Sequence, residues 1–319
     1  MSMPKNNEDT IEVRDVLILG SGPAGLAAAL YAARAELSPL ILTGMTLYGQ
    51  ASTTDTIENY PGFPEGIGGS ELGQLFQNQA ERFGAEIVMD YATGVDLQKA
   101  PFIVHTYSKT YAGKTLIITT GADPKKLNIP GEKELTCRGV SYCGTCDGWF
   151  FKDKDIVVVG GGDSALEEGL FLTRFAKSVT VIHRRDQLRA SAILQNRAFA
   201  NPKISFVWNS VITEILGEDR VEGVRIQNVN TNEEHVMTTE GIFIFIGHKP
   251  NTELFENKLE MGDKGYIVVN KFMETSIPGV FAAGEIADPH FRQVITSAGM
   301  GAAAGIQATR YLENLENQD

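Results

Sequence analysis

The chain has 319 residues, of which 43% are hydrophobic and 21% charged, a composition that predicts packed globular structure and excludes a largely disordered protein. The length suggests about two domains. The net charge of −12 disfavours nucleic-acid binding, because proteins that bind nucleic acids gain most of their non-specific affinity by neutralising phosphates with basic side chains. The polar segment 1–10 lacks the apolar core of a secretory signal, and no apolar run could span a membrane. We therefore expect a cytoplasmic protein with a short disordered N-terminal tail.

The order of apolar runs and glycine-rich turns predicts two similar units. The first contains a strand, a turn, an Ala-rich helix and a second strand, at Val13–Leu19, 20–25, 26–36 and 39–43. The second repeats this order at Asp155–Val159, 160–165, 166–177 and Ser178–Ile182. Further strands are expected at 102–107, 115–119, 241–246 and 279–283, and a long C-terminal helix at 293–314. The repeat predicts an α/β protein with two doubly wound, Rossmann-like nucleotide-binding domains.

The first glycine-rich turn carries the spacing Gly20-x-Gly22-x-x-Gly25 between a strand and a helix. In a dinucleotide fingerprint these glycines allow the tight turn, the approach of a pyrophosphate and close helix–strand packing. A plain glycine turn is the alternative, and the strand–helix context favours nucleotide binding. The next strand ends at Thr43-Gly44, without the acidic residue that an NAD site uses for the ribose.

The second turn carries Gly160-x-Gly162-x-x-Ala165, again between a strand and a helix. Basic side chains stand where an NAD site would have an acid, at Arg184, Arg185 and Arg189. A guanidinium group can grip a 2′-phosphate through two parallel hydrogen bonds. This pattern favours NADP(H) over NAD(H), with a solvated basic turn as the alternative.

A Cys-x-x-Cys pair, Cys143 and Cys146, lies just before the second unit and is followed by Asp147. Such a pair can be redox-active or can form half of a zinc site. A structural zinc site needs four ligands, and the third cysteine and five scattered histidines do not supply a second pair. We therefore favour a redox pair and expect no metal site. Asp147 is a candidate acid or base for the thiol protons, or else a turn-forming residue.

A flavin can carry electrons between a two-electron nicotinamide and a disulfide. Two nucleotide folds and one redox pair thus suggest transfer from NADPH through FAD to Cys143 and Cys146, and then to a substrate.

The chain closely resembles the low-molecular-weight thioredoxin reductases, the class II pyridine nucleotide-disulfide oxidoreductases, over almost its whole length. The resemblance rests on nine motifs in the right order, namely GSGPAG at Gly20, GQASTT at Gly49, NYPGF at Asn59, CGTCDG at Cys143, GGGDSA at Gly160, HRRD with Arg189, GHKPNT at Gly247, GVFAAGE at Gly279 and RQVITSAG at Arg292. Each motif alone is weakly specific, whereas the ordered set is highly specific.

The resemblance implies a discontinuous FAD domain, residues 1–121 and 246–319, around an NADPH domain, residues 122–245, that carries the redox pair. It implies a homodimer that reduces thioredoxin, with hinges near 120–123 and 245–249. The residues expected to bind FAD are Gly20, Ser21, Gly22, Pro23, Ala24, Thr43, Gly49, Gln50, Asn59, Thr120, Gly121, Gly284, Glu285, Arg292, Gln293 and Val294. Those expected to bind NADPH are Gly160, Gly162, Asp163, Ser164, Arg184, Arg185 and Arg189.

Three positions differ from the pattern of the family. One is Thr119, which precedes Thr120 and Gly121 where Ala is common, and we expect no consequence from it. Glu285 stands where Asp is common, which keeps a carboxylate but must reposition it, and Cys137 lies outside the motif and is interpreted as a small buried or loop residue. Two other functions stay open. One is a related flavin enzyme with another disulfide partner or electron donor, which the Cys-Gly-Thr-Cys-Asp motif and the arginines disfavour. The other is a redox sensor that binds the nucleotides without turnover.

Overall fold

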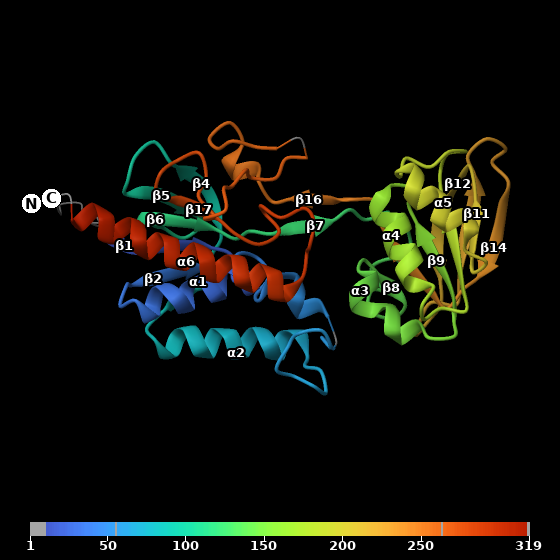
Figure 1. Ribbon diagram of the computed structural model, residues 1–319, viewed down its shortest axis with the longest axis horizontal. Coiled ribbons are helices and arrows are strands. Elements are labelled where there is room, and N and C mark those ends of the chain that lie inside the picture. Colours follow the sequence, from blue (N-terminus) through green and yellow to red (C-terminus); the bar gives the residue numbers. More distant parts are fainter. Residues whose placement is uncertain (1–10, 55, 263, 318–319) are drawn as a thin grey trace, which may run out of the picture. The chain divides into compact units, whose positions relative to one another are not determined.

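The computed structural model describes residues 11–54, 56–262 and 264–317, so the tail expected at 1–10 lies outside the described residues. The chain divides into two compact units. Unit 1 runs up to Asp123 and resumes at Pro250, and unit 2 is Pro124–Lys249. Figure 1 shows the helices and strands of each unit.

Unit 1 is built on a seven-stranded sheet in the order β3-β2-β1-β6-β5-β4, with β17 added beside β6. Strands β3, β2, β1, β6 and β17 are mutually parallel, and β4, β5 and β6 form an antiparallel meander. Strand β6 is long enough to pair with β5 along its first half and with β17 along its second. The bounds are β1 (Val13–Leu19), β2 (Pro39–Leu42), β3 (Glu86–Val88), β4 (Ala92–Asp96), β5 (Phe102–Thr106), β6 (Thr110–Ile118) and β17 (Val280–Ala282).

Helices α1 (Pro23–Arg34) and α6 (Val294–Glu316) lie side by side against this sheet, and α2 (Gly69–Arg82) packs against α1 (Figure 1). Small residues allow the close approach of α1 and α6. A Cβ atom added at Gly301 would lie 2.0 Å from the Ala24 carbonyl oxygen, and one at Gly305 would lie 2.6 Å from the Ala28 carbonyl oxygen. Short 3-10 helices at Gly49–Thr53 and Glu253–Phe255 complete the unit. Strand β1 is apolar along its buried part because its side chains enter a core on both faces of the sheet.

Unit 2 contains a five-stranded parallel sheet in the order β11-β10-β9-β15-β8 and a separate antiparallel sheet, β12-β13-β14. The parallel strands are β8 (Val140–Ser141), β9 (Asp155–Val159), β10 (Ser178–Ile182), β11 (Ile204–Val207) and β15 (Gly241–Ile244). The helices are α3 (Gly144–Asp147), a 3-10 turn (Gly148–Phe151), α4 (Asp163–Leu172) and α5 (Ala192–Ala200). The antiparallel strands are β12 (Ser210–Leu216), β13 (Gly223–Asn228) and β14 (Glu234–Thr238).

The two chain segments that join the units pair with each other as strands β7 (Ala122–Pro124) and β16 (His248–Pro250). Gly121 and Gly247, beside these strands, have φ angles of 69° and 108°. Only glycine adopts such angles without strain, so the sequence allows sharp turns at both segments.

The predicted α/β class with two doubly wound sheets is confirmed, and several elements differ in length. The strand predicted at 115–119 is Thr110–Ile118, because its first half, in which Tyr111, Ala112 and Gly113 are buried, pairs with β5. The helix predicted at 166–177 is Asp163–Leu172, since the last residues of the fingerprint turn form its first turn. It ends at Leu172, and Lys203 Nζ donates to the carbonyl oxygens of Thr173 and Ala176 just beyond it.

Among the described residues, no helix is long and apolar enough to cross a membrane.

Candidate functional site

The turn between β1 and α1 is shaped by its three glycines. Gly20 has a φ of 107°, and a Cβ atom there would lie 2.4 Å from the Thr119 carbonyl oxygen. A Cβ atom at Gly25 would lie 1.9 Å from the Gly20 carbonyl oxygen. At Gly22 the nearest atom to such a Cβ is the Gly49 Cα, at 4.0 Å. The middle glycine therefore leaves space at the N-terminus of α1, where Pro23 and Ala24 begin the helix, and this space fits a nucleotide phosphate.

Ser21 is the polar anchor of this turn. Its buried hydroxyl donates to the Thr43 carbonyl oxygen at 3.1 Å and accepts from the Tyr48 backbone N–H at 3.2 Å. Tyr48 has a left-handed φ of 65°, and its hydroxyl lies 2.8 Å from Gln74 Oε1 and 2.9 Å from Gln77 Oε1. Tyr48 thus connects α2 to the turn and holds Gly49 beside Gly22. It was not predicted, because nothing in its sequence surroundings marks it.

Gln50 and Thr120 form hydrogen bonds at the segment that follows β6, and Gly121 lies in the same segment. Gln50 Nε2 donates to the Ala122 carbonyl oxygen and to Asp123 Oδ1. The Thr120 hydroxyl donates to the Asn251 carbonyl oxygen, and Asn251 Nδ2 donates to the Thr120 carbonyl oxygen, both at 3.0 Å. Asn251 was not predicted as a site residue, although it lies inside the GHKPNT motif. Its side chain fixes the backbone at the start of the connection to unit 2.

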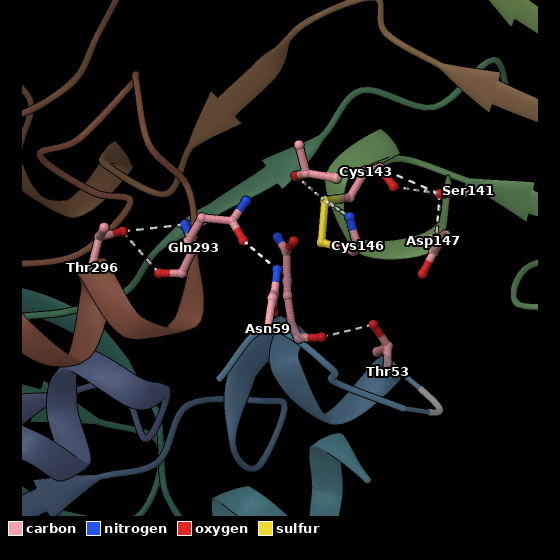
Figure 2. Close-up of a disulfide and its surroundings, with 10 residues drawn as sticks. Thr53, Asn59, Ser141, Cys143, Cys146, Asp147, Gln293 and Thr296 are labelled. Atoms are coloured by element: carbon pink, nitrogen blue, oxygen red, sulfur yellow. Dashed lines mark hydrogen bonds between the residues drawn. A yellow bond between two sulfur atoms is a disulfide. The ribbon is translucent and has the colours of Figure 1, made fainter. Parts of the chain in front are cut away.

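Asn59 and Gln293 are joined by a hydrogen bond from Asn59 Nδ2 to Gln293 Oε1, at 3.1 Å (Figure 2). Gln293 also forms the N-terminal capping box of α6 with Thr296, so Val294 is the first residue of the helix. The structure therefore brings together residues that are 234 positions apart in the chain. Arg292, just before the cap, has a left-handed φ of 50°.

Gly284 and Glu285 follow strand β17. Gly284 has a φ of 79°, and a Cβ atom there would lie 2.9 Å from the Ala24 side chain, so this turn packs against the start of α1. Burial raises the pKa of the Glu285 carboxyl to about 7. Arg292 opposes the shift in this pKa, while Asp288 and Asp123 add to it. A carboxyl group near the start of α1 and α6 is thus poised between its neutral and charged forms at neutral pH.

The turn between β9 and α4 repeats the first turn with a different third residue. Gly160 has a φ of 149°, and a Cβ atom there would lie 2.5 Å from the Phe245 carbonyl oxygen. No atom lies within 4 Å of a Cβ at Gly162, which leaves the same open space as at Gly22. Asp163 Oδ1 accepts the Ser191 backbone N–H at 2.7 Å, and Ser164 lies half-buried in the first turn of α4.

The segment after β10 folds back over the second turn. The backbone N–H groups of Arg189 and Ala190 donate to the Gly161 carbonyl oxygen at 2.7 and 3.2 Å. His183 is buried beneath Gly161, and its Nε2 lies 3.1 Å from the Gln187 carbonyl oxygen. Burial lowers the pKa of His183, and the charges of the nearby arginines lower it further. A neutral histidine thus supports this segment; it lies in the HRRD motif but was not predicted as a site residue.

The three predicted arginines of this segment are exposed, namely Arg184, Arg185 and Arg189. Within the described ranges none of their guanidinium groups forms an ion pair. All three act on the pKa of His183 and therefore lie in one neighbourhood. Their charge, and the backbone contact of Arg189 with Gly161, fit the 2′-phosphate of NADPH.

Cys143 and Cys146 form a disulfide at the start of α3, with their Cα atoms 5.3 Å apart (Figure 2). Cys143 caps the helix, and its Sγ accepts the Cys146 backbone N–H at 3.2 Å. The Thr145 hydroxyl lies 3.4 Å from the same sulfur. Both contacts can stabilise a thiolate at Cys143 once the disulfide is reduced. Cys137 was expected to be either a small buried residue or a loop residue. It is exposed in a turn and takes no part in the disulfide, so it is a loop residue.

Asp147 ends helix α3, one residue beyond the disulfide. Its Oδ2 accepts a hydrogen bond from the Ser141 hydroxyl at 2.6 Å (Figure 2). Burial raises the pKa of Asp147, and the bond from Ser141 lowers it. A carboxyl group with a raised pKa, next to Cys146 in the chain, is a candidate to exchange protons with the thiols of the reduced pair. In the part of the chain that the structure describes, no group of three His, Cys, Asp or Glu residues could hold a metal ion.

Comparison with known proteins gives a consistent result. Residues 14–301 match the family model of the pyridine nucleotide-disulphide oxidoreductases. The thioredoxin reductase of Streptomyces coelicolor is 49% identical over 311 residues, which is 97% of both chains. That of Mycolicibacterium smegmatis is 50% identical over 301 residues, 94% of this chain and 97% of the relative. The crystal structure of the Streptococcus pyogenes thioredoxin reductase matches with a TM-score of 0.90 and 46% identity, over 96% of this chain and 100% of that one.

Proposed function

Since the chain belongs to the pyridine nucleotide-disulphide oxidoreductase family, we propose that it is a thioredoxin-disulfide reductase that uses NADPH and FAD. The observation that carries this function is the Cys143–Cys146 disulfide, followed directly in the chain by Asp147 with its raised pKa, in the same unit as the second nucleotide turn. Relatives that are thioredoxin reductases match almost the whole chain and support the same substrate.

We assign the FAD site to unit 1 and the NADPH site to unit 2. In unit 1, the open space at Gly22 would receive the FAD pyrophosphate, and Asn59, Glu285 and Gln293 would contact the rest of the cofactor. In unit 2, the open space at Gly162 would receive the NADPH pyrophosphate. The exposed guanidinium groups of Arg184, Arg185 and Arg189 would bind its 2′-phosphate. The chemistry that a bound flavin supplies is two-electron transfer between a nicotinamide and a disulfide.

The reduced cysteine pair transfers two electrons to the substrate by thiol–disulfide exchange. A thiolate of the pair attacks one sulfur of the substrate disulfide and forms a mixed disulfide, while the other substrate sulfur leaves as a thiolate. The second cysteine then attacks the mixed disulfide, which re-forms the Cys143–Cys146 bond and releases the second substrate sulfur. The contacts at Cys143 Sγ support this residue as the attacking thiolate. Asp147 accepts or returns the protons of the pair during these steps.

The proposal extends to the assembly and location of the protein. The resemblance implies a homodimer, and we place the enzyme in the cytoplasm with thioredoxin as its protein substrate. Sedimentation of the FAD-loaded protein tests the dimer, for which we expect twice the monomer mass of 34.7 kDa. A mass of one chain at all concentrations would contradict this part of the proposal.

Separate replacement of Cys143 and Cys146 by Ser tests the role of the pair. We expect each variant to keep its FAD and the bleaching of the flavin by NADPH, and to lose thioredoxin reduction. Cys137→Ser is the matched control, because Cys137 lies outside the disulfide and should keep full turnover. Thioredoxin reduction at the wild-type rate by either variant of the pair would refute the assignment.

A further inference from the structure

The proposed mechanism gives no role to Ser141, although its hydroxyl contacts both Asp147 and the backbone of Cys143. Ser141 ends strand β8, two residues before the pair, and only 4% of its surface is exposed. Its Oγ lies 2.6 Å from Asp147 Oδ2, 3.1 Å from the Cys143 backbone nitrogen and 3.2 Å from the Cys143 carbonyl oxygen. One buried hydroxyl thus touches both the proposed acid and the backbone of a redox cysteine.

The donors and acceptors around Ser141 fit either protonation state of Asp147. A hydroxyl group can donate one hydrogen bond and accept two. When Asp147 is ionised, Ser141 donates to Oδ2 and accepts from the Cys143 N–H. When Asp147 is protonated, its own O–H can donate to Ser141 Oγ, and the serine proton can turn to the Cys143 carbonyl oxygen. The Cys143 N–H bond is kept in both states, so only hydrogens move.

We infer that Ser141 is a positioning residue for proton transfer, whose hydroxyl holds the Asp147 carboxyl group in place in both of its protonation states. This inference rests on the proposed function, because it gives a partner to the acid that serves the dithiol. Backbone N–H groups alone could not do this, since an N–H group cannot accept a hydrogen bond from a protonated carboxyl group.

Other titratable groups lie in the same neighbourhood. They are Cys143 and Cys146 of the same turn and Glu168 of α4, whose Oε2 would lie 2.3 Å from a Cβ added at Gly144. Burial and the bond from Ser141 are the causes of the Asp147 pKa shift, and the bond acts in favour of the ionised form. Removal of the hydroxyl is therefore expected to raise the pKa of Asp147 further.

The test compares Ser141→Ala with Ser178→Ala. Ser178 makes a matched control, because its hydroxyl donates to Asp155 Oδ1 at the same distance of 2.6 Å in the same unit, on strands β9 and β10. Both are measured as FAD-loaded protein, with thioredoxin reduction followed against pH and flavin bleaching by NADPH recorded separately. Carboxyl ¹³C NMR of the oxidised protein reports the pKa of Asp147 without turnover, with Asp147→Asn used to assign its signal.

We expect Ser141→Ala to slow thioredoxin reduction roughly tenfold, a part of the ~10²–10⁴-fold that acid–base catalysis contributes. In the pH–rate profile of Ser141→Ala, we also expect the part that depends on Asp147, identified by its loss in Asp147→Asn, to shift to higher pH. The pKa of Asp147 measured by NMR should rise with it. Flavin bleaching and both properties of Ser178→Ala should stay as in the wild type. If Ser141→Ala does not fold, Ser141→Cys, which is similar in size and a weaker donor, should show a smaller shift in the same direction.

A pH profile and an NMR pKa that match the wild type would overturn the role of Ser141 and leave the proposed function intact. Absence of thioredoxin reduction by the wild type at every pH would instead overturn the function on which the inference rests.

Discussion

The two fingerprint turns use one backbone arrangement in different surroundings. In each, a glycine with positive φ ends the strand, and the middle glycine leaves open space at a helix N-terminus. In unit 1 the second strand leads into Thr43 and Gly44, and Ser21 and Tyr48 brace the turn. In unit 2 the second strand leads into buried His183 and exposed arginines. We propose that the turn provides a phosphate site in both units, and that the segment after the second strand determines which nucleotide fits.

The third fingerprint position also differs, since it is Gly25 in unit 1 and Ala165 in unit 2. Gly25 tolerates no side chain, because its Cβ would lie 1.9 Å from the Gly20 carbonyl oxygen. Ala165 already carries a Cβ and is fully buried. The helix therefore sits closer to the turn in unit 1, where Gly301 and Gly305 of α6 also press against α1. Unit 1 should tolerate added volume poorly, and unit 2 should tolerate its removal.

The largest effect is expected from an exchange of these third residues. Gly25→Ala should abolish FAD retention and cost about 1–3 kcal/mol of stability, the usual range for overpacking. Ala165→Gly should cost only about 1 kcal/mol and keep both nucleotide activities. Chemical denaturation and the flavin absorbance of the purified proteins measure both properties. Equal losses in the two variants would show that the two turns are packed alike.

The next effect concerns the nucleotide specificity of unit 2. Arg184→Ala with Arg185→Ala should raise the KM for NADPH at least about 10- to 100-fold, because the loss of even one charged hydrogen bond costs about 1.5–3 kcal/mol. The KM for NADH should change little, since NADH lacks the 2′-phosphate. Arg220→Ala, an exposed arginine in the turn between β12 and β13, is the control. A parallel rise for both nucleotides would mean that the arginines do not read the 2′-phosphate.

A smaller effect concerns Glu285 of unit 1, whose ionised carboxyl group has a charge opposite to that of the arginines of unit 2. Burial raises the pKa of Glu285 from 4.5 to about 7. Between pH 4.5 and pH 7, the folded protein therefore keeps a proton on this carboxyl group that the unfolded chain has already released. Stability of the FAD-free protein should therefore fall as the pH rises from 4.5 through 7, by roughly 3 kcal/mol from this group. Glu285→Gln should flatten this part of the curve, as measured by denaturation at several pH values. A wild-type slope in the variant would contradict the assignment.

The regular β-α-β units could be predicted from the sequence because their strands are short apolar runs, and the first strand of each unit leads directly into a glycine-rich turn. Strands Asp155–Val159 and Ser178–Ile182 were predicted at their observed bounds. Helix α2 and strands β12–β14 were not predicted. In strands β12 and β13, buried residues are interspersed with partly exposed ones. Helix α2 presents polar residues on most of its surface, so none of these three elements forms a continuous apolar run.

The site could be predicted where a residue type carries the chemistry. The redox cysteines are an example, because their motif marks them and they form the disulfide, whereas the binding roles of the glycines and the arginines stay predictions. Tyr48, Asn251 and Ser141 act through hydrogen bonds to residues distant in the chain or to groups set by the local turn. Such contacts depend on where the backbone brings a polar atom, which spacing alone does not reveal.

The most direct test of the central claim follows thiol release from a chromogenic disulfide by the FAD-loaded protein. The reaction contains NADPH or NADH, with and without a thioredoxin. We predict release that requires thioredoxin and is much faster with NADPH than with NADH. A protein whose flavin is bleached by NADPH, yet which releases no thiol with thioredoxin, would contradict the proposed transfer from the Cys143–Cys146 pair to thioredoxin.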